Sequence, residues 1–160
     1  MAVNAYLIID GVDGPSQSRT NAIDILSFSF GASMTSTYQA GSSGQESKAG
    51  RADVSNVTIM KVLDKTSPVL FANCVSGTPM NKVTISYDKP IGKKQEDYFK
   101  IELEDAMITS IQLSGSNENP VESVSFAFEK VTVEYNPEDA DGNLTAFLKK
   151  GFDMSKLVPF

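Results

Sequence analysis

The stretch from Tyr98 to Tyr135 constrains the fold more than any other part of the chain. It contains two long runs of alternating residues joined by a polar turn, Ser114 to Pro120. In the first run the apolar residues share one parity: Phe99, Ile101, Leu103, Met107, Ile111 and Leu113. Successive side chains of a strand point to opposite faces of a sheet, so this period of two is typical of a half-buried strand. The stretch therefore predicts a long β-hairpin.

The return run of this hairpin changes parity near its middle. Its apolar residues are even at first (Val124, Phe126, Phe128) and then odd (Val131, Val133, Tyr135). A continuous strand cannot make this switch without an inserted residue, so we expect a β-bulge or sharp coil at Glu129–Lys130. The run from Ala22 to Gly31 shows a second switch near Ile25–Leu26. Two bent strands in one small domain indicate a sheet that curls into a barrel.

One short helix is predicted at about Ser67–Ser76. Ser67 is a suitable N-cap, Pro68 falls at the first helical position, and Gly77 follows the end. With a single helix signal among several strand signals, the chain is expected to be mainly β.

The segment at about Ala32–Asp53 differs from the rest in composition. Gly, Ser, Thr, Ala and Gln dominate it, and Met34 and Tyr38 are its only sizeable apolar residues. About twenty residues without periodicity are uncommon inside a compact domain. Two interpretations remain open: a surface loop, or an arm that becomes ordered against another molecule.

Charge and composition exclude several classes of protein. The net charge is −6, and the Lys and Arg residues do not cluster, which argues against nucleic acid as a partner. No apolar run is long enough to span a bilayer, so no membrane insertion is expected. The first ten residues lack a basic region and resemble a strand, so we expect no signal peptide.

The chain offers little equipment for catalysis. It has no histidine, the commonest general base and metal ligand, and Cys74 is its only cysteine. Glu102 and Glu104 lie on the polar side of a predicted strand, where solvent keeps both ionised. The acidic segment at 139–143 departs from a calcium loop in the offset of its glycine. We expect no catalytic, cofactor-binding or metal-binding residues, and an assembly module rather than an enzyme.

Six segments, in their order along the chain, carry a family resemblance. They are residues 1–14 (MAVNAYLIIDGVDG), 25–31 (ILSFSFG), 64–70 (DKTSPVL), 108–115 (ITSIQLSG), 126–135 (FAFEKVTVEY) and 151–153 (GFD). In this order the chain resembles the haemolysin-coregulated protein (Hcp) family, the inner-tube subunits of bacterial type VI secretion systems. The resemblance runs from residue 1 to about 155. The family often carries Trp at the positions of Phe28 and Phe30, and Trp or Tyr at that of Phe152.

The resemblance implies a fold and an assembly. The fold would be a two-sheet antiparallel β-barrel with one short flanking α-helix (about Ser67–Ser76) and a long extended loop (about Ala32–Asp53). A single domain would cover 1–160, with 136–160 as a C-terminal linker and tail. Subunits would form hexameric rings with a wide channel, and rings would stack into a tube capped by a spike.

The same resemblance implies partners and a location. A contractile sheath with its baseplate would expel the tube, which can carry small effectors in its channel. The chain would lie in the bacterial cytoplasm before firing and would then be secreted or delivered into a target cell. No cofactor is implied.

Two sets of residues are predicted to serve this assembly. We expect the arm to reach an adjacent ring, with Tyr38 as its anchor; the interface candidates are Ser33, Tyr38, Gln45, Glu46, Lys48 and Arg51. A second hypothesis places Ser27, Ser29, Ser114 and Ser116 on the channel wall, because small neutral hydroxyls would let cargo slide without strong binding.

Three alternatives remain open. The first is a tail-tube subunit of a contractile phage or phage-derived particle. The second is a monomeric β-barrel that binds a small ligand inside. The third is a fused effector enzyme, for which the chain has little room. A measurement of the mass of the native protein would distinguish rings from monomers.

Overall fold

The computed structural model describes residues 4–36 and 49–160. The first strands are β1 (Asn4–Ile9), β2 (Ile23–Asp24), β3 (Ser27–Ser29), β4 (Ala32–Ser36), β5 (Ala49–Val54) and β6 (Val57–Val62). After the helix α1 (Ser67–Ser76) come β7 (Met80–Ile91), β8 (Lys94–Ser114), β9 (Val121–Ala127), β10 (Lys130–Tyr135), β11 (Leu148–Asp153) and β12 (Val158–Pro159). The chain is therefore mainly β, as expected.

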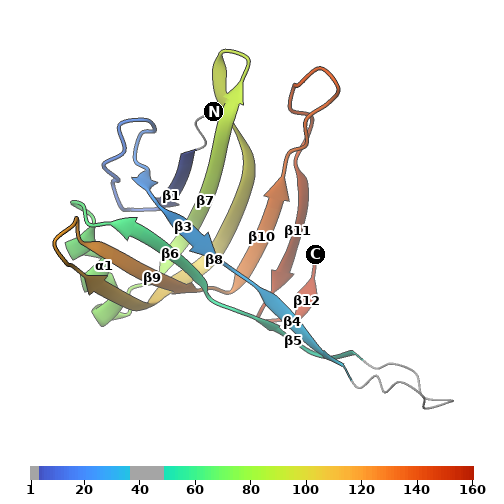
Figure 1. The fold of residues 1–160 in the computed structure, drawn as a ribbon. Helices are drawn as coiled ribbons and strands as arrows, with labels where there is room; N and C mark the ends of the chain where they lie inside the picture. Colours follow the sequence, from blue (N-terminus) through green and yellow to red (C-terminus); the bar gives the residue numbers. More distant parts are fainter. Residues whose placement is uncertain (1–3, 37–48) are drawn as a thin grey trace.

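The strands form two antiparallel layers that share one long strand, β8. The first sheet has the order β12-β11-β10-β8-β7-β1-β2, and the second has the order β3-β6-β9-β8. The N-terminal part of β8 pairs with β7 and β10, whereas Met107–Ser114 pairs with β9. The two layers face each other, and α1 lies at one end (Figure 1). The expected fold, two antiparallel sheets with a flanking helix at Ser67–Ser76, is confirmed.

The core lies between the two layers. Its buried side chains come from the inward parity of the strands and include Leu7, Ile23, Ile59, Val83, Ile85, Ile101, Leu103, Val124 and Phe126. Leu70 is the helix residue that joins this core. The burial of these apolar side chains is the main force that holds the layers together.

Both parity switches mark places where the chain crosses between the layers. Strand β9 belongs to the second sheet and ends at Ala127, and β10 belongs to the first sheet and begins at Lys130. The break therefore lies at Phe128–Glu129, one residue before the predicted position. In the same way, Ile25–Leu26 separates β2 of the first sheet from β3 of the second.

The prediction of one parity along β8 is wrong in the middle of the strand. Ala106 and Ile108 are buried, whereas Met107 is 40% exposed. Asp105 adopts a left-handed backbone conformation, with φ at 52°, which turns the following side chains over. A bulge between Ile108 and Ser110 then reverses the change.

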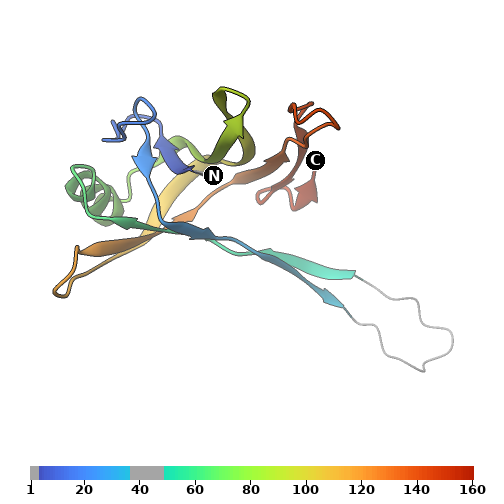
Figure 2. The same cartoon turned by 45° about the horizontal axis from the view of Figure 1, so that its top comes forward.

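The prediction of an extended loop at Ala32–Asp53 is wrong at both ends of the segment. Strands β4 and β5 pair antiparallel, with Ala32 opposite Val54. They form the base of a hairpin that projects from the body of the molecule (Figures 1 and 2). The pairing extends the inward apolar parity of Phe28 and Phe30 as far as Met34, because β4 continues the direction of β3. Residues 37–48 lie outside the described residues.

The helix needs a small correction, and the structure shows where the C-terminal tail docks. The N-cap is Thr66 rather than Ser67, and Gly77 ends the helix at φ 65°. The tail docks on its own subunit, because β11 pairs with β10 and the Gly151 N–H donates to the Phe160 carbonyl at 2.8 Å. Across the described residues, we find no helix long and apolar enough to cross a membrane.

Candidate functional site

The outward face of the second sheet is lined by hydroxyls, and we call it the hydroxyl face. Directly paired residues of antiparallel strands share a face, so the register defines its members. One row runs from Ser29 through Thr58 and Ser125 to Ser110. The full polar set is Ser27, Ser29, Thr58, Ser110, Gln112, Ser114, Ser123 and Ser125.

The chemistry of the hydroxyl face is polar but uncharged. Thr58 Oγ1 and Ser125 Oγ share a hydrogen bond at 2.9 Å, and the other hydroxyls are partly or fully open to water. The apolar members, Met60, Val62 and Val121, are neighbours at one end of the face, where Val62 pairs directly with Val121. A face of this kind offers many weak hydrogen-bonding groups and no charged anchor.

Three of the four serines predicted for the channel wall lie on this face. Ser27, Ser29 and Ser114 are exposed members of it, whereas Ser116 lies in the β8–β9 turn beyond the strand. The prediction missed the other polar members of the face, among them Ser123 and Ser125. Their alternation with Val124 and Phe126 was the signal that could have identified them.

The predicted interface residues of the arm are only partly described. Ser33 and Arg51 are exposed on the hairpin, and the Arg51 N–H donates to Thr35 Oγ1 at 3.0 Å. Ser33 pairs with Asp53 and so lies on the face opposite Met34. The other candidates, Tyr38, Gln45, Glu46 and Lys48, lie outside the described residues.

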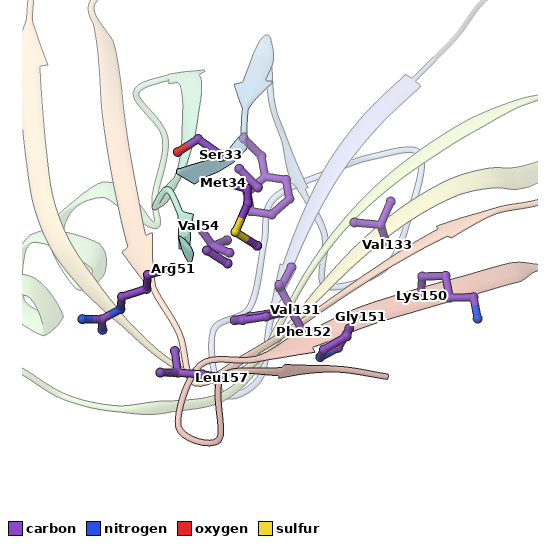
Figure 3. A pocket seen from close by; sticks show the side chains of 14 residues that line it. Ser33, Met34, Arg51, Val54, Val131, Val133, Lys150, Gly151, Phe152 and Leu157 are labelled. Atoms are coloured by element: carbon purple, nitrogen blue, oxygen red, sulfur yellow. The ribbon is translucent and has the colours of Figure 1, made fainter. Parts of the chain in front are cut away.

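An apolar groove of about 900 Å³ separates the hairpin base from strands β10–β12. We call it the arm groove. Its walls are mostly inward-facing apolar residues, including Phe30, Met34, Val54, Val131, Val133 and Phe152. Arg51 and Lys150 lie at opposite ends of it (Figure 3). The groove exists because the two layers separate here, so the apolar lining of the core continues to the surface.

A buried ion pair lies on the reverse side of the hydroxyl face. Lys61 and Glu122 are directly paired across β6 and β9, both are fully buried, and their charged groups are in contact. Lys61 Nζ also contacts Asp64 Oδ1 at 3.1 Å, and Ser67 Oγ donates to Glu122 Oε1 at 3.1 Å. The pair thus ties the start of α1 to the second sheet.

The sequence contains a pattern that indicates this ion pair, although our sequence analysis did not identify it. Lys61 shares the inward parity of Val57 and Ile59, and Glu122 shares that of Val124. Charged residues on an inward parity must be paired, because an isolated buried charge is too costly. Their role is to fix the helix on the sheet.

The pKa shifts of titratable groups on the first sheet are caused mainly by burial and by hydrogen bonds. Burial raises the pKa of Tyr6 and of Tyr87. A hydrogen bond to Glu102 raises the pKa of Lys82, and one from Ser155 lowers the pKa of Asp153. Among residues 4–36 and 49–160, no cluster of three or more His, Cys, Asp or Glu could hold a metal ion.

Taken together, these surfaces define a mainly β protein that presents broad faces to other molecules: a neutral face, an apolar groove and a projecting hairpin. The sequence model of the family described as "Type VI secretion system effector, Hcp" matches residues 6–135. The chain belongs to this Hcp family.

Individual relatives agree with this assignment. Protein hcp1 of Pseudomonas aeruginosa is 32% identical over 146 residues, which cover 89% of this chain and 88% of that protein. The crystal structure of Hcp1 from Salmonella typhimurium has a TM-score of 0.78 and 27% identity, with each chain covered completely. A structure described as a type six secretion system protein shares the fold with a TM-score of 0.88 at 24% identity, covering 99% of this chain and 100% of that one.

Proposed function

We propose that the chain is a structural, non-enzymatic subunit of a type VI secretion tube. It forms homohexameric rings that stack into a tube, and contraction of a sheath expels the tube. The observation that carries the proposal is the hydroxyl face: a four-stranded sheet with one side on the core and a neutral, open other side.

The edges of the second sheet support a ring. Among the described strands, β3 pairs only with β6, and Met107–Ser114 pairs only with β9, so each has one unpaired side. Unpaired strand edges invite association with other chains. A closed head-to-tail ring covers such edges in every subunit by symmetry.

The hydroxyl face turned toward the channel would form its wall. Ser27, Ser29 and Ser114 would line the wall, with Ser116 at its rim. Because the face carries no ionised group, effector cargo would meet many weak contacts and no strong one. Replacing Ser29 with Phe should leave rings intact and reduce cargo export; unchanged export would count against this role.

The arm would connect one ring to the next. Its length and its scarcity of sizeable apolar residues are the support for this role. The proposed contacts come from Ser33, Tyr38, Gln45, Glu46, Lys48 and Arg51, with Tyr38 as the anchor.

The remaining partners follow from membership of a secretion-tube assembly. A spike would cap the tube, and a sheath and baseplate would hold it before firing, in the bacterial cytoplasm. After firing the chain would be outside the cell or in a target cell. The acidic net charge of −6 gives no support for binding nucleic acid. No cofactor is part of the proposal.

The test is electron microscopy and native mass spectrometry of the full chain beside a variant lacking Thr37–Ala49. We expect six-fold rings for both proteins, and stacked tubes only for the intact chain. In a second variant, Gly and Ser replace the same segment at equal length. This variant keeps the length of the arm but removes its side chains, so it shows which of the two stacking requires. Normal stacking by both variants would contradict the role of the arm.

One observation favours a second candidate function. The arm groove has a volume within the usual range of small-molecule sites, roughly 300 to 1,000 Å³. A monomeric ligand-binding barrel would therefore be supported if the full chain had the mass of a single subunit at micromolar concentration.

A further inference from the structure

The helix α1 is unusual in having apolar residues on more than its buried side. Its sequence, SPVLFANCVS, contains no charged residue. Leu70 and Ser67 are its buried members, whereas Phe71 is 50% exposed and Val75 is 71% exposed. A surface helix normally turns charged residues to water, and a helix that is apolar all round is normally covered. Phe71 and Val75 are four residues apart, so they share one face, which we call the outer helix face.

The arm groove is a concave apolar surface that could receive the outer helix face. Met34 is 53% exposed inside it, and Val133 and Leu157 are open to solvent as well. These side chains come from the hairpin base, from β10 and from the tail, and they surround one space (Figure 3). The groove therefore presents apolar surface that one subunit leaves uncovered.

The two surfaces lie at opposite ends of the molecule. Helix α1 is at one end of the second sheet, and the hairpin base with β10–β12 is at the other (Figures 1 and 2). They cannot meet within one chain. Since one is convex and the other concave, neither is suited to pair with a copy of itself, and their mutual contact would be head-to-tail. Repetition of such a contact closes a ring when the rotation between subunits allows it.

Charge favours the same pairing. The groove has a cation at each end, Arg51 and Lys150. Helix α1 has no basic residue in its last turn, so the partial negative charge of its C-terminal end is not offset there. Asp105 is exposed and lies two residues before Met107, whose Cε approaches the Gly77 position at this helix end. An apolar helix face with negative charge beside it matches an apolar groove with positive ends.

We propose that the outer helix face of one subunit docks into the arm groove of the next subunit in the ring. This inference rests on the proposed ring-forming function and names the surfaces that build the ring. The occupant of the groove is thus a second copy of this chain.

The test uses two acidic substitutions at residues that are more than half exposed, so that each subunit still folds. Val75→Glu places a charge on the outer helix face, and Met34→Glu places one in the arm groove. Each variant alone should be monomeric in native mass spectrometry, with subunit association weakened at least about 100-fold. An equimolar mixture should form heterodimers and stop there, because the mixture retains one intact helix and one intact groove.

Controls separate the possible outcomes. Phe71→Glu and Val133→Glu repeat the test at a second pair of positions, and circular dichroism confirms the fold of each variant. Val62→Glu, an acidic substitution on the hydroxyl face, should assemble as the unaltered chain does. Rings from either single variant, or a mixture that stays monomeric, would overturn the inference while leaving the tube function intact. Failure of the unaltered chain to form rings would instead contradict the proposed function.

Discussion

The hydroxyl face and the arm groove are built from neighbouring strands but have opposite chemistry. The hydroxyl face is neutral, and most of its hydroxyls are open to water. The arm groove is concave and apolar, and its walls are an uncovered continuation of the core. The groove therefore gains more free energy by excluding water than the hydroxyl face does. The comparison indicates that the chain reserves one surface for lasting contact and the other for transient contact.

The largest expected effect is on the free energy of unfolding, for a substitution on the reverse side of the hydroxyl face. Lys61→Met leaves the buried Glu122 carboxylate without its cation, which should lower the free energy of unfolding by about 3–5 kcal/mol. The double variant Lys61→Met with Glu122→Leu should recover most of the loss, because no buried charge remains. Chemical denaturation measures both changes. A single variant as stable as the unaltered chain would show that the pair does not hold the sheet.

A matched pair of methionines tests the difference between the two surfaces directly. Met34→Ser in the groove should weaken subunit association about tenfold or more, because apolar surface that the contact would bury is lost. Met60→Ser, at a 37% exposed position on the hydroxyl face, should leave association unchanged. Sedimentation of both variants over a range of concentrations gives the two values. Equal weakening would remove the distinction between the surfaces.

Removal of hydroxyls should have a smaller effect. Ser123→Ala and Ser125→Ala change the polarity of the face with little change in shape, so ring formation should remain normal and cargo retention should shift only a few-fold. Pull-down of a small effector with the assembled tube would measure this. A complete loss of cargo would show that the face holds a specific binding site instead.

The smallest effect concerns acid stability of the tail, which forms one wall of the groove. Asp153 accepts hydrogen bonds from Ser155 Oγ at 2.6 Å, Ser155 N at 2.9 Å and Lys156 N at 3.1 Å, and the first of these contributes most to lowering its pKa. A carboxyl whose pKa is lower in the folded state stabilises the fold above its unfolded pKa, about 3.9. That stability is lost as the pH falls through the folded pKa.

The matching variant is Asp153→Asn. It should be slightly less stable than the unaltered chain at neutral pH, and the difference should shrink below about pH 4. Thermal melts across that range would show it. A constant difference at every pH would contradict the assigned cause.

Much of the fold was predictable from local patterns. The parity switches at Ile25–Leu26 and near Glu129 located both crossings between layers, because each crossing reverses the side of the chain that faces the core. Pro68 predicted the start of the helix and Gly77 predicted its end, and both agree with the observed bounds. Such features depend on near neighbours in the sequence, which is why they could be read from it.

Other features could not be predicted because they depend on partners distant in the sequence. In β8 the left-handed Asp105 reverses which side chains face the core, and the following bulge reverses them back. Leu113 therefore has the same parity as in a regular strand, and the sequence pattern hides both irregularities. The arm groove needs β4–β5 and β10–β12 in the same place, and no local pattern shows that. Lys61 and Glu122 were visible as charges on an inward parity, but only their pairing explains them.

Docking of the outer helix face into the arm groove is tested by native mass spectrometry of the Val75→Glu and Met34→Glu variants, alone and mixed, beside the unaltered chain. We expect a hexamer of the 17.3 kDa chain for the unaltered protein, monomers for each variant, and heterodimers for the mixture. Hexamers from either variant, or a mixture without heterodimers, would contradict the assignment of the groove as the subunit contact.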